Sequence, residues 1–172
     1  MNIIIRNEIG SDVETISEIT KAAFESLAIS NHTEQFIVCA LRDANALTIS
    51  LVAEVEKKVV GRIAFSPVTI SDGSPDWYGL GLISVVPELQ KQGIGKSLVY
   101  EGLSLLKALG AKGCVLVGDP GYHERFGFRN VTDLFIDGVP QQYFLALPFE
   151  ESKTSGTVVF HEGFSVTERG HG

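Results

Sequence analysis

Hydrophobic residues recur at helical spacing in two segments near the start of the chain. In the first segment, Asp12 is followed by apolar residues three or four positions apart, which are Val13, Ile16, Ile19, Ala23 and Leu27. Because Asp is a favoured N-cap residue, the pattern predicts a helix from Asp12 to about Leu27. The second segment, residues 34–42, carries its apolar residues on one side and predicts a shorter helix.

Extended runs of β-forming residues lie around these helices. Residues 3–6 are a short run, and residues 48–54 and 59–69 are two longer runs joined by a charged turn. Two such runs around a tight polar turn predict a β-hairpin. Residues 77–86 predict a third strand of the same sheet, which ends at Pro87 because proline cannot donate to a strand ladder.

The second half of the chain alternates in the same way. A helix is predicted over residues 95–109, with Gly110 as its C-terminal cap. A strand, a short helix and two more strands are predicted at residues 112–117, 122–126, 131–136 and 142–147. No repeat or Pro/Ser-rich linker divides this plan. The sequence therefore predicts one mixed α/β domain over residues 1–172, with a C-terminal extension from about residue 150.

Composition and charge narrow the classes of function. Hydrophobic residues make up 44% and charged residues 20%, so the chain is expected to fold unaided. A net charge of -7 argues against nucleic acid and membrane as partners. No apolar run approaches the length of a signal or membrane-spanning segment, and Cys39 and Cys114 lie in apolar surroundings typical of reduced thiols. The protein is expected to be cytoplasmic.

A glycine-rich stretch, QKQGIGKSL at residues 90–98, leads into the predicted helix 95–109. Such a turn presents unpaired backbone N–H groups at the positive end of a helix dipole, and it therefore attracts phosphate. A P-loop would need glycine at position 90, where the chain has Gln90, and a dinucleotide fingerprint would need glycine in place of Leu98. A P-loop hydrolase, with Asp119 as a magnesium ligand, therefore stays a disfavoured alternative.

The same loop resembles the acetyl-coenzyme A signature of GNAT-family N-acetyltransferases when it is aligned from Val85. In that family a strand ends in a Pro-containing turn and leads into Arg/Gln-x-x-Gly-x-Gly/Ala, which opens a helix. Gln90, Gly93 and Gly95 match this pattern. A second stretch, GDPGYHERFGF at residues 118–128, resembles the segment after the next strand of the family. Together with GTVVFHEGF in the tail, it is similar to the YhbS-like bacterial branch.

The resemblance implies a fold and a cofactor site. The expected fold is α+β, with a mixed, mostly antiparallel sheet flanked by helices and with its fourth and fifth strands splayed apart. Coenzyme A would lie in that cleft, and its pyrophosphate would contact the backbone of the glycine loop. The implied cofactor-binding residues are Ile83, Ser84, Val85, Gln90, Lys91, Gln92, Gly93, Ile94, Gly95, Lys96, Ser97, Tyr122 and Phe126.

The candidate catalytic residues depart from the family pattern. Many members have a tyrosine five residues before the last aromatic residue of Gly-Phe, and its hydroxyl protonates the departing thiolate. In this chain that position is His123, and Tyr122 is its neighbour. A histidine can donate a proton near neutral pH, so His123 is slightly preferred and Tyr122 stays the alternative. Both can also be structural.

The base that deprotonates the amine is less well defined. Residues 78–86 contain no acid, so Glu34 and Asp119 are the remaining candidates, although Asp119 equally fits a helix cap. No cluster of His, Cys and Asp has metal-ligand spacing, and no nucleophile elbow is present. The sequence therefore predicts direct attack of the amine on the thioester, with no metal and no acyl-enzyme.

The predicted function is an acetyl-coenzyme A-dependent N-acetyltransferase that acts on a primary amine of a small molecule or a protein. The alternative within the same fold is a module that senses acyl-coenzyme A without turnover. The acceptor is not identified by the sequence, because the segments that would bind it carry no motif. A homodimer is compatible with the sequence.

Overall fold

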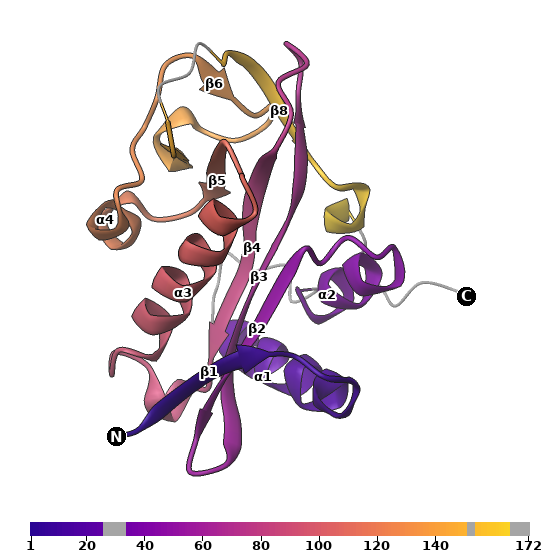
Figure 1. Cartoon of the computed structure of the whole chain (residues 1–172), viewed down its shortest axis with the longest axis vertical. Helices are drawn as coiled ribbons and strands as arrows, with labels where there is room; N and C mark the ends of the chain where they lie inside the picture. The colour runs from indigo at the N-terminus through magenta and orange to yellow at the C-terminus, as the bar shows by residue number, and fades with distance from the viewer. Residues whose placement is uncertain (26–33, 151–153, 166–172) are drawn as a thin grey trace.

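The computed structural model describes residues 1–25, 34–150 and 154–165. A twisted sheet runs through the molecule, with one long helix on one face and two helices on the other (Figure 1). Its strands are β1 (Ile3–Asn7), β2 (Ile49–Val55), β3 (Lys58–Ile70), β4 (Trp77–Val85), β5 (Gly113–Val117), β6 (Leu134–Phe135), β7 (Phe144–Pro148) and β8 (Gly156–Phe160).

The main path of the sheet has the order β1-β2-β3-β4-β5-β7. Every neighbouring pair along it is antiparallel except β4 and β5, which are parallel. β8 pairs antiparallel with the end of β3 and parallel with β6. The expected mixed, mostly antiparallel sheet is therefore confirmed.

The α-helices are α1 (Val13–Glu25), α2 (Glu34–Asp43), α3 (Ile94–Ala108) and α4 (Pro120–His123), and short 3-10 turns are η1 (Gly10–Asp12), η2 (Pro87–Leu89), η3 (Glu124–Phe126), η4 (Gln141–Tyr143) and η5 (Glu162–Ser165). The amphipathic pattern of α3 explains its position, because Ile94, Leu98, Val99, Leu103 and Leu106 are buried against the sheet. On the opposite face, Ile16 of α1 and Val38 of α2 pack against Val52 of β2.

β4 and β5 separate after a short paired segment. Their register covers only Trp77↔Gly113, Tyr78↔Cys114 and Gly79↔Val115, although β4 continues to Val85. Within β4, Leu82 is an extra residue in the pairing with β3, since Ile63 faces Ile83 and Ala64 faces Gly81. Leu82 has a positive φ of 65°, as a bulged residue can have. The expected splay of these two strands is thus present.

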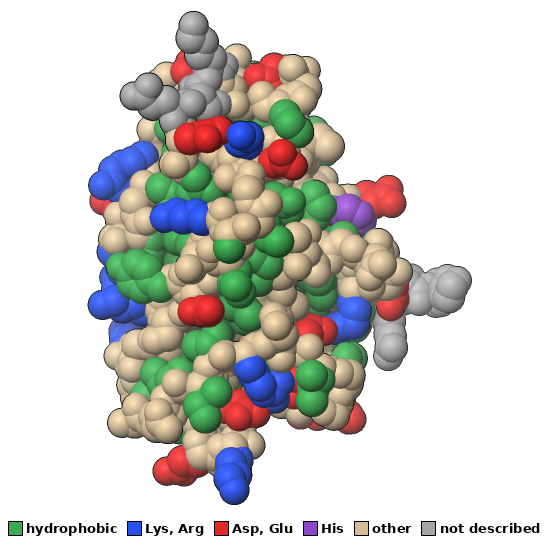
Figure 2. Space-filling model, viewed as in Figure 1, with side chains coloured by type: hydrophobic (Ala, Val, Ile, Leu, Met, Phe, Trp, Pro, Cys, Tyr) green, Lys and Arg blue, Asp and Glu red, His purple; other side chains and the backbone are tan. Residues whose placement is uncertain are grey.

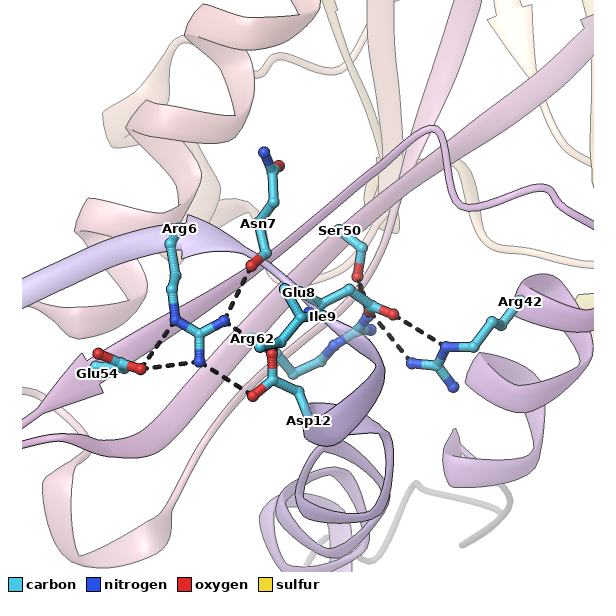
Figure 3. A network of polar contacts seen from close by, with 9 residues as sticks. All are labelled: Arg6, Asn7, Glu8, Ile9, Asp12, Arg42, Ser50, Glu54 and Arg62. Carbon is cyan, nitrogen blue, oxygen red and sulfur yellow. Dashed lines mark hydrogen bonds and ion pairs between the residues drawn. The ribbon is translucent and has the colours of Figure 1, made fainter.

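A polar network joins β1 to the elements around it (Figure 3). Arg6 donates from Nη1 and Nη2 to the Asp12 carboxylate at 2.8 and 3.0 Å, and from Nε to Glu54 of β2 at 2.9 Å. Glu8 accepts from Arg42 of α2 and from Ser50 of β2. These contacts fix the start of α1 and the end of α2 against the same edge of the sheet.

Several predicted elements differ from the observed ones in type or in extent. Asp12 ends a 3-10 turn rather than capping the helix, because its carboxylate pairs with Arg6 and accepts from the Ile9 N–H at 2.8 Å. The strand predicted at residues 131–136 shrinks to Leu134–Phe135, which pairs with Gly156–Thr157 of β8. Gly110 follows the helix at a φ of 87°, as a C-terminal cap does. The predicted helix end at Leu27 lies outside the described residues.

Charges of both signs are scattered over the face drawn in Figure 2, between patches of hydrophobic and uncharged polar surface. Lys and Arg side chains gather along its left edge, the side on which α3 and α4 lie in Figure 1. In the described parts of the chain, no helix combines the length and the apolar character that crossing a membrane requires.

Candidate functional site

A cavity of about 670 Å³ lies where β4 separates from β5 and where α3 begins. It is bounded by the end of β4, the turn before α3, the first turn of α3, and α4 with η3. Its lining residues are Ile83, Val85, Leu89, Gln90, Lys91, Gly93, Gly95, Lys96, Tyr122 and Arg125. The predicted loop residues and the predicted end of the fourth strand therefore meet at one site.

The backbone of β4 faces this cavity through alternate residues. The Val86 N–H donates to the Val60 carbonyl at 2.9 Å, so this pair is hydrogen-bonded across the antiparallel ladder. By alternation, the N–H and C=O groups of Val85 and Ile83 point away from β3, toward the side where β5 has diverged. The Gln90 amide donates to the Val85 carbonyl at 3.1 Å, which is consistent with this orientation. The strand thus offers backbone groups without a strand partner.

The turn before α3 is shaped for an anion. Lys91 and Gly93 have positive φ angles of 64° and 90°, and Gly93 is the N-cap of α3 without a side-chain cap bond. Successive backbone N–H groups in such a turn converge on one side, at the positive end of the helix dipole. Gly95 lies in the first helical turn, where a Cβ would meet the Tyr122 hydroxyl oxygen at 2.9 Å. Glycine here leaves room for the close approach of the Tyr122 hydroxyl.

Five predicted cofactor residues lie beside the cavity rather than in its lining. Ser84 is buried on the opposite face of β4, and Ile94 belongs to the core under α3. Phe126 is also buried, and its ring contacts Tyr122 and Tyr100 at centroid distances of 5.6 and 5.2 Å. The side chains of Gln92 and Ser97 donate to the carbonyls of Glu88 and Gly93. Their backbone groups still belong to the turn and the first turn of α3.

Tyr122 is half-buried in the wall of the cavity, between the start of α3 and η3. Its ring stands nearly perpendicular to the His123 ring, at 4.9 Å and 88°. The Arg125 guanidinium lies over the ring at 4.8 Å from its centroid. Burial raises the pKa of Tyr122, and the positive charge of Arg125 partly opposes that rise.

His123 is directed away from the cavity. Only 8% of it is exposed, and it packs against Phe126 and Phe128 at ring centroid distances of 6.5 and 6.1 Å. Its Nδ1 is buried without a hydrogen-bond partner. Burial lowers the pKa of His123 to about 4, although Asp119 opposes this shift, so the ring is neutral at neutral pH.

The two predicted bases lie in different surroundings. The Asp119 side chain caps α4 and accepts from the Gly121 N–H at 2.9 Å. Glu34 begins α2, which packs on the face of the sheet opposite α3, and it is not among the residues lining the cavity (Figure 1).

Across residues 1–25, 34–150 and 154–165, no group of three His, Cys, Asp or Glu side chains could hold a metal ion.

Two lining residues, Leu89 and Arg125, were not predicted from the sequence. Leu89 ends the 3-10 turn that follows Pro87. Arg125 is three positions after Tyr122, a spacing that brings side chains to the same side of a helical turn. Once Tyr122 is taken as a site residue, this spacing in the sequence predicts Arg125 as its neighbour.

Comparisons with known proteins agree with this architecture. The acetyltransferase (GNAT) family matches residues 13–128. The uncharacterized N-acetyltransferase YhbS of Escherichia coli strain K12 is 38% identical over 128 residues, which cover 74% of each chain. A crystal structure of Escherichia coli YhbS in complex with CoA superposes with a TM-score of 0.88 at 32% identity, over 98% of this chain and 94% of that chain.

A second solved structure is similar along nearly its whole length. The crystal structure of a GNAT family acetyltransferase from Brucella melitensis in complex with acetyl-CoA has 46% sequence identity and a TM-score of 0.85. The match covers 95% of this chain and 98% of that chain. With the family match over more than half of its residues, the splayed β4 and β5, and the glycine turn before α3, this chain belongs to the GNAT family of acetyltransferases.

Proposed function

We propose that this protein is an acetyl-CoA-dependent N-acetyltransferase that transfers the acetyl group to a primary amine. The observation that carries the proposal is the cavity at the splayed strands, where the glycine turn meets β4 backbone groups that have no strand partner. Two similar proteins were crystallised with acetyl-CoA and with CoA. The P-loop alternative receives no support, since the turn follows a strand of an antiparallel hairpin and Gln90 replaces the required glycine.

The residues present fit a cofactor of this kind. Backbone N–H groups from Gln90 to Ser97 are suited to the pyrophosphate, and Lys91 and Lys96 add positive charge at the same wall. The backbone groups of Ile83 and Val85 are suited to the amides of the pantetheine arm. Acetyl-CoA would supply the activated acetyl group, and no metal is needed for this chemistry.

The proposed reaction is direct attack of the neutral amine on the thioester carbonyl. A C–N bond forms, the C–S bond breaks, the thiolate of coenzyme A leaves, and the attacking nitrogen releases a proton to water. Tyr122 is the proposed proton donor to this thiolate, because its side chain lines the cavity whereas His123 is packed among aromatic rings. A neutral His123 has no acidic proton to give near neutral pH, which also supports Tyr122. This choice differs from the sequence-based preference for His123.

The acceptor is a primary amine of a small molecule or a protein. The base that deprotonates it is assigned neither to Glu34 nor to Asp119, because neither lines the cavity and Asp119 already caps α4. The cytoplasmic location and a homodimer stay predictions.

The test is the release of coenzyme A from acetyl-CoA in the presence of a panel of amines. Tyr122→Phe is expected to lower kcat by about a hundredfold while the KM for acetyl-CoA changes little, because proton donation matters only as the thiolate leaves. Tyr100→Phe is the matched control, since Tyr100 also contacts Phe126 but does not line the cavity. It should leave kcat unchanged.

Other outcomes would point elsewhere. A large loss of kcat in His123→Ala with normal activity in Tyr122→Phe would assign the donor to His123. Tight binding of acetyl-CoA without release of coenzyme A for any amine would support the acyl-coenzyme A sensor instead.

A further inference from the structure

Arg125 is an exposed arginine that lies over an aromatic ring in the wall of the cavity. It follows α4 in η3, and its guanidinium lies over the face of the Tyr122 ring, 4.8 Å from the centroid, in the wall of the same cavity. In the described parts of the chain it forms no ion pair with a carboxylate. Its charge is therefore not neutralised by an acid and is available to Tyr122.

The Tyr122 side chain is held on several sides. Phe126 contacts the ring at 5.6 Å and 67°, and His123 contacts it at 4.9 Å and 88°. The hydroxyl oxygen lies beside Gly95, in the first turn of α3, where the helix dipole is positive. Arg125 adds a full positive charge on the ring face. Two sources of positive potential thus act on one phenol.

The positive charge near Tyr122 matters because a phenol does not readily give its proton to a thiolate. A phenol is a weaker acid than a thiol, and burial raises the pKa of Tyr122 further. When the Tyr122 O–H bond breaks and an S–H bond forms on the leaving thiolate, a phenolate remains until solvent returns the proton. A cation above the ring lowers the free energy of that phenolate relative to the phenol.

We propose that Arg125 is a positioning residue for acetyl transfer, which holds the Tyr122 ring and stabilises the phenolate that forms when Tyr122 protonates the coenzyme A thiolate. The inference rests on the proposed function of Tyr122 as donor. Charged or titratable groups on the elements around Tyr122 include Asp119, His123, Glu124 and Arg125 beside it in the chain, Glu88 and Lys91 before α3, and Lys96, Tyr100, Glu101 and Lys107 in α3. Of these groups, Arg125 holds its charge over the face of the Tyr122 ring and opposes the rise in the pKa of Tyr122.

The first experiment compares Arg125→Gln with Lys96→Gln, because both residues are cations in the lining of one cavity. Arg125→Gln is expected to lower kcat roughly tenfold with little change in the KM for acetyl-CoA. It should also move the alkaline limb of the kcat profile to higher pH, since the phenol loses its proton later. Arg125→Lys should restore part of kcat. Lys96→Gln should raise the KM modestly and leave the pH profile unchanged.

The second experiment needs no turnover. Ultraviolet difference titration of the wild type against Tyr122→Phe isolates the ionisation of Tyr122 from those of Tyr78, Tyr100 and Tyr143. In the Arg125→Gln background, the pKa of Tyr122 should be higher than in the wild type, whereas Lys96→Gln should leave it unchanged.

These readouts distinguish the effect of Arg125 on Tyr122 from the proposed role of Tyr122 as proton donor. An unchanged Tyr122 titration in Arg125→Gln overturns the inference, whether or not an acceptor is found. A higher KM for acetyl-CoA with an unchanged pH profile also overturns it, because Arg125 would then bind the cofactor phosphates. A shifted titration combined with normal turnover in Tyr122→Phe would instead remove Tyr122 as donor, and the catalytic role of Arg125 with it.

Discussion

Gly93 and Gly95 lie two residues apart in one motif, and glycine has a different physical role at each position. Gly93 has a φ of 90° and no atom within 4 Å of an added Cβ, so its backbone conformation is what excludes other residues. Gly95 has an ordinary helical backbone, and an added Cβ would meet the Tyr122 hydroxyl at 2.9 Å. Gly93 therefore allows the backbone conformation of the turn, and Gly95 leaves space for the hydroxyl of Tyr122, the proposed proton donor.

Gly93→Ala is expected to weaken coenzyme A binding at least tenfold, because relieving the strained φ would turn the N–H groups of the loop away from the pyrophosphate. Gly73→Ala is a matched control, since Gly73 has a φ of 83° and equally open surroundings but lies in the turn after β3. Each change should cost about 1–2 kcal/mol of stability. Isothermal titration with coenzyme A and urea unfolding measure the two effects. Equal affinity in both variants would contradict the phosphate role of this turn.

At the scale of elements, Arg6 fixes the start of α1 to the sheet. Its guanidinium bridges Asp12, at the end of η1, and Glu54, in β2. The pKa of the Asp12 carboxyl is lowered, chiefly by its hydrogen bonds from Arg6, against the opposing effect of burial. A carboxyl with a lowered pKa stabilises the fold above its ordinary pKa, and this stabilisation is lost as the pH falls through its lowered value.

Arg6→Gln is therefore expected to reduce the free energy of unfolding at pH 7 by about 1–3 kcal/mol, because a nearly buried carboxylate loses its charged donor. Below about pH 4 the difference from the wild type should shrink, since Asp12 then becomes protonated in the unfolded chain, and it should vanish as the pH falls through the lowered pKa of the folded protein. Urea unfolding from pH 7 to pH 3 measures this. The control Lys112→Gln breaks an exposed pair with Glu150 and should change little. A difference independent of pH would contradict the role of the ion pair.

At the scale of the whole molecule, the end of the described chain returns to the centre of the sheet. The rings of Phe160 and Phe164 pack edge to face, with centroids 5.3 Å apart and an interplanar angle of 64°, over two glycines of β4. A Cβ at Gly81 would lie 2.4 Å from the Phe164 ring, and one at Gly79 would lie 3.4 Å from Phe160. The C-terminal segment therefore covers β4 on the face opposite the core under α3, next to the Leu82 bulge.

Phe164→Ala is expected to lower the free energy of unfolding by about 1–3 kcal/mol, because the half-buried ring would no longer cover the β4 backbone. Phe135→Ala removes an equal side chain that is 43% exposed, and it should cost less. Fluorescence of Trp77, which is buried and is the single tryptophan of the chain, reports the transition. Equal losses in the two variants would contradict the larger contribution expected from the contact of Phe164 with β4.

The sequence by itself determined the order of the main elements and the place of the glycine turn before α3. Helical and alternating hydrophobic spacings are local properties, and Gln90, Gly93 and Gly95 carry the signature of the turn within six residues. The bounds of short elements were predicted less well from the sequence. The two-residue strand Leu134–Phe135 is an example, because it is defined by its pairing with β8, which comes from a distant part of the chain.

Tertiary structure alone decided which side chains reach the cavity. Tyr122 and His123 are neighbours on a helix of one turn, and no periodicity over so short a segment states which of them faces outward. Packing decides it, since the pocket formed by Phe126 and Phe128 takes His123 and leaves Tyr122 beside Gly95. The same holds for Arg125, because its position over the Tyr122 ring depends on η3 following α4 at a particular angle, and that angle is fixed by long-range contacts of the core.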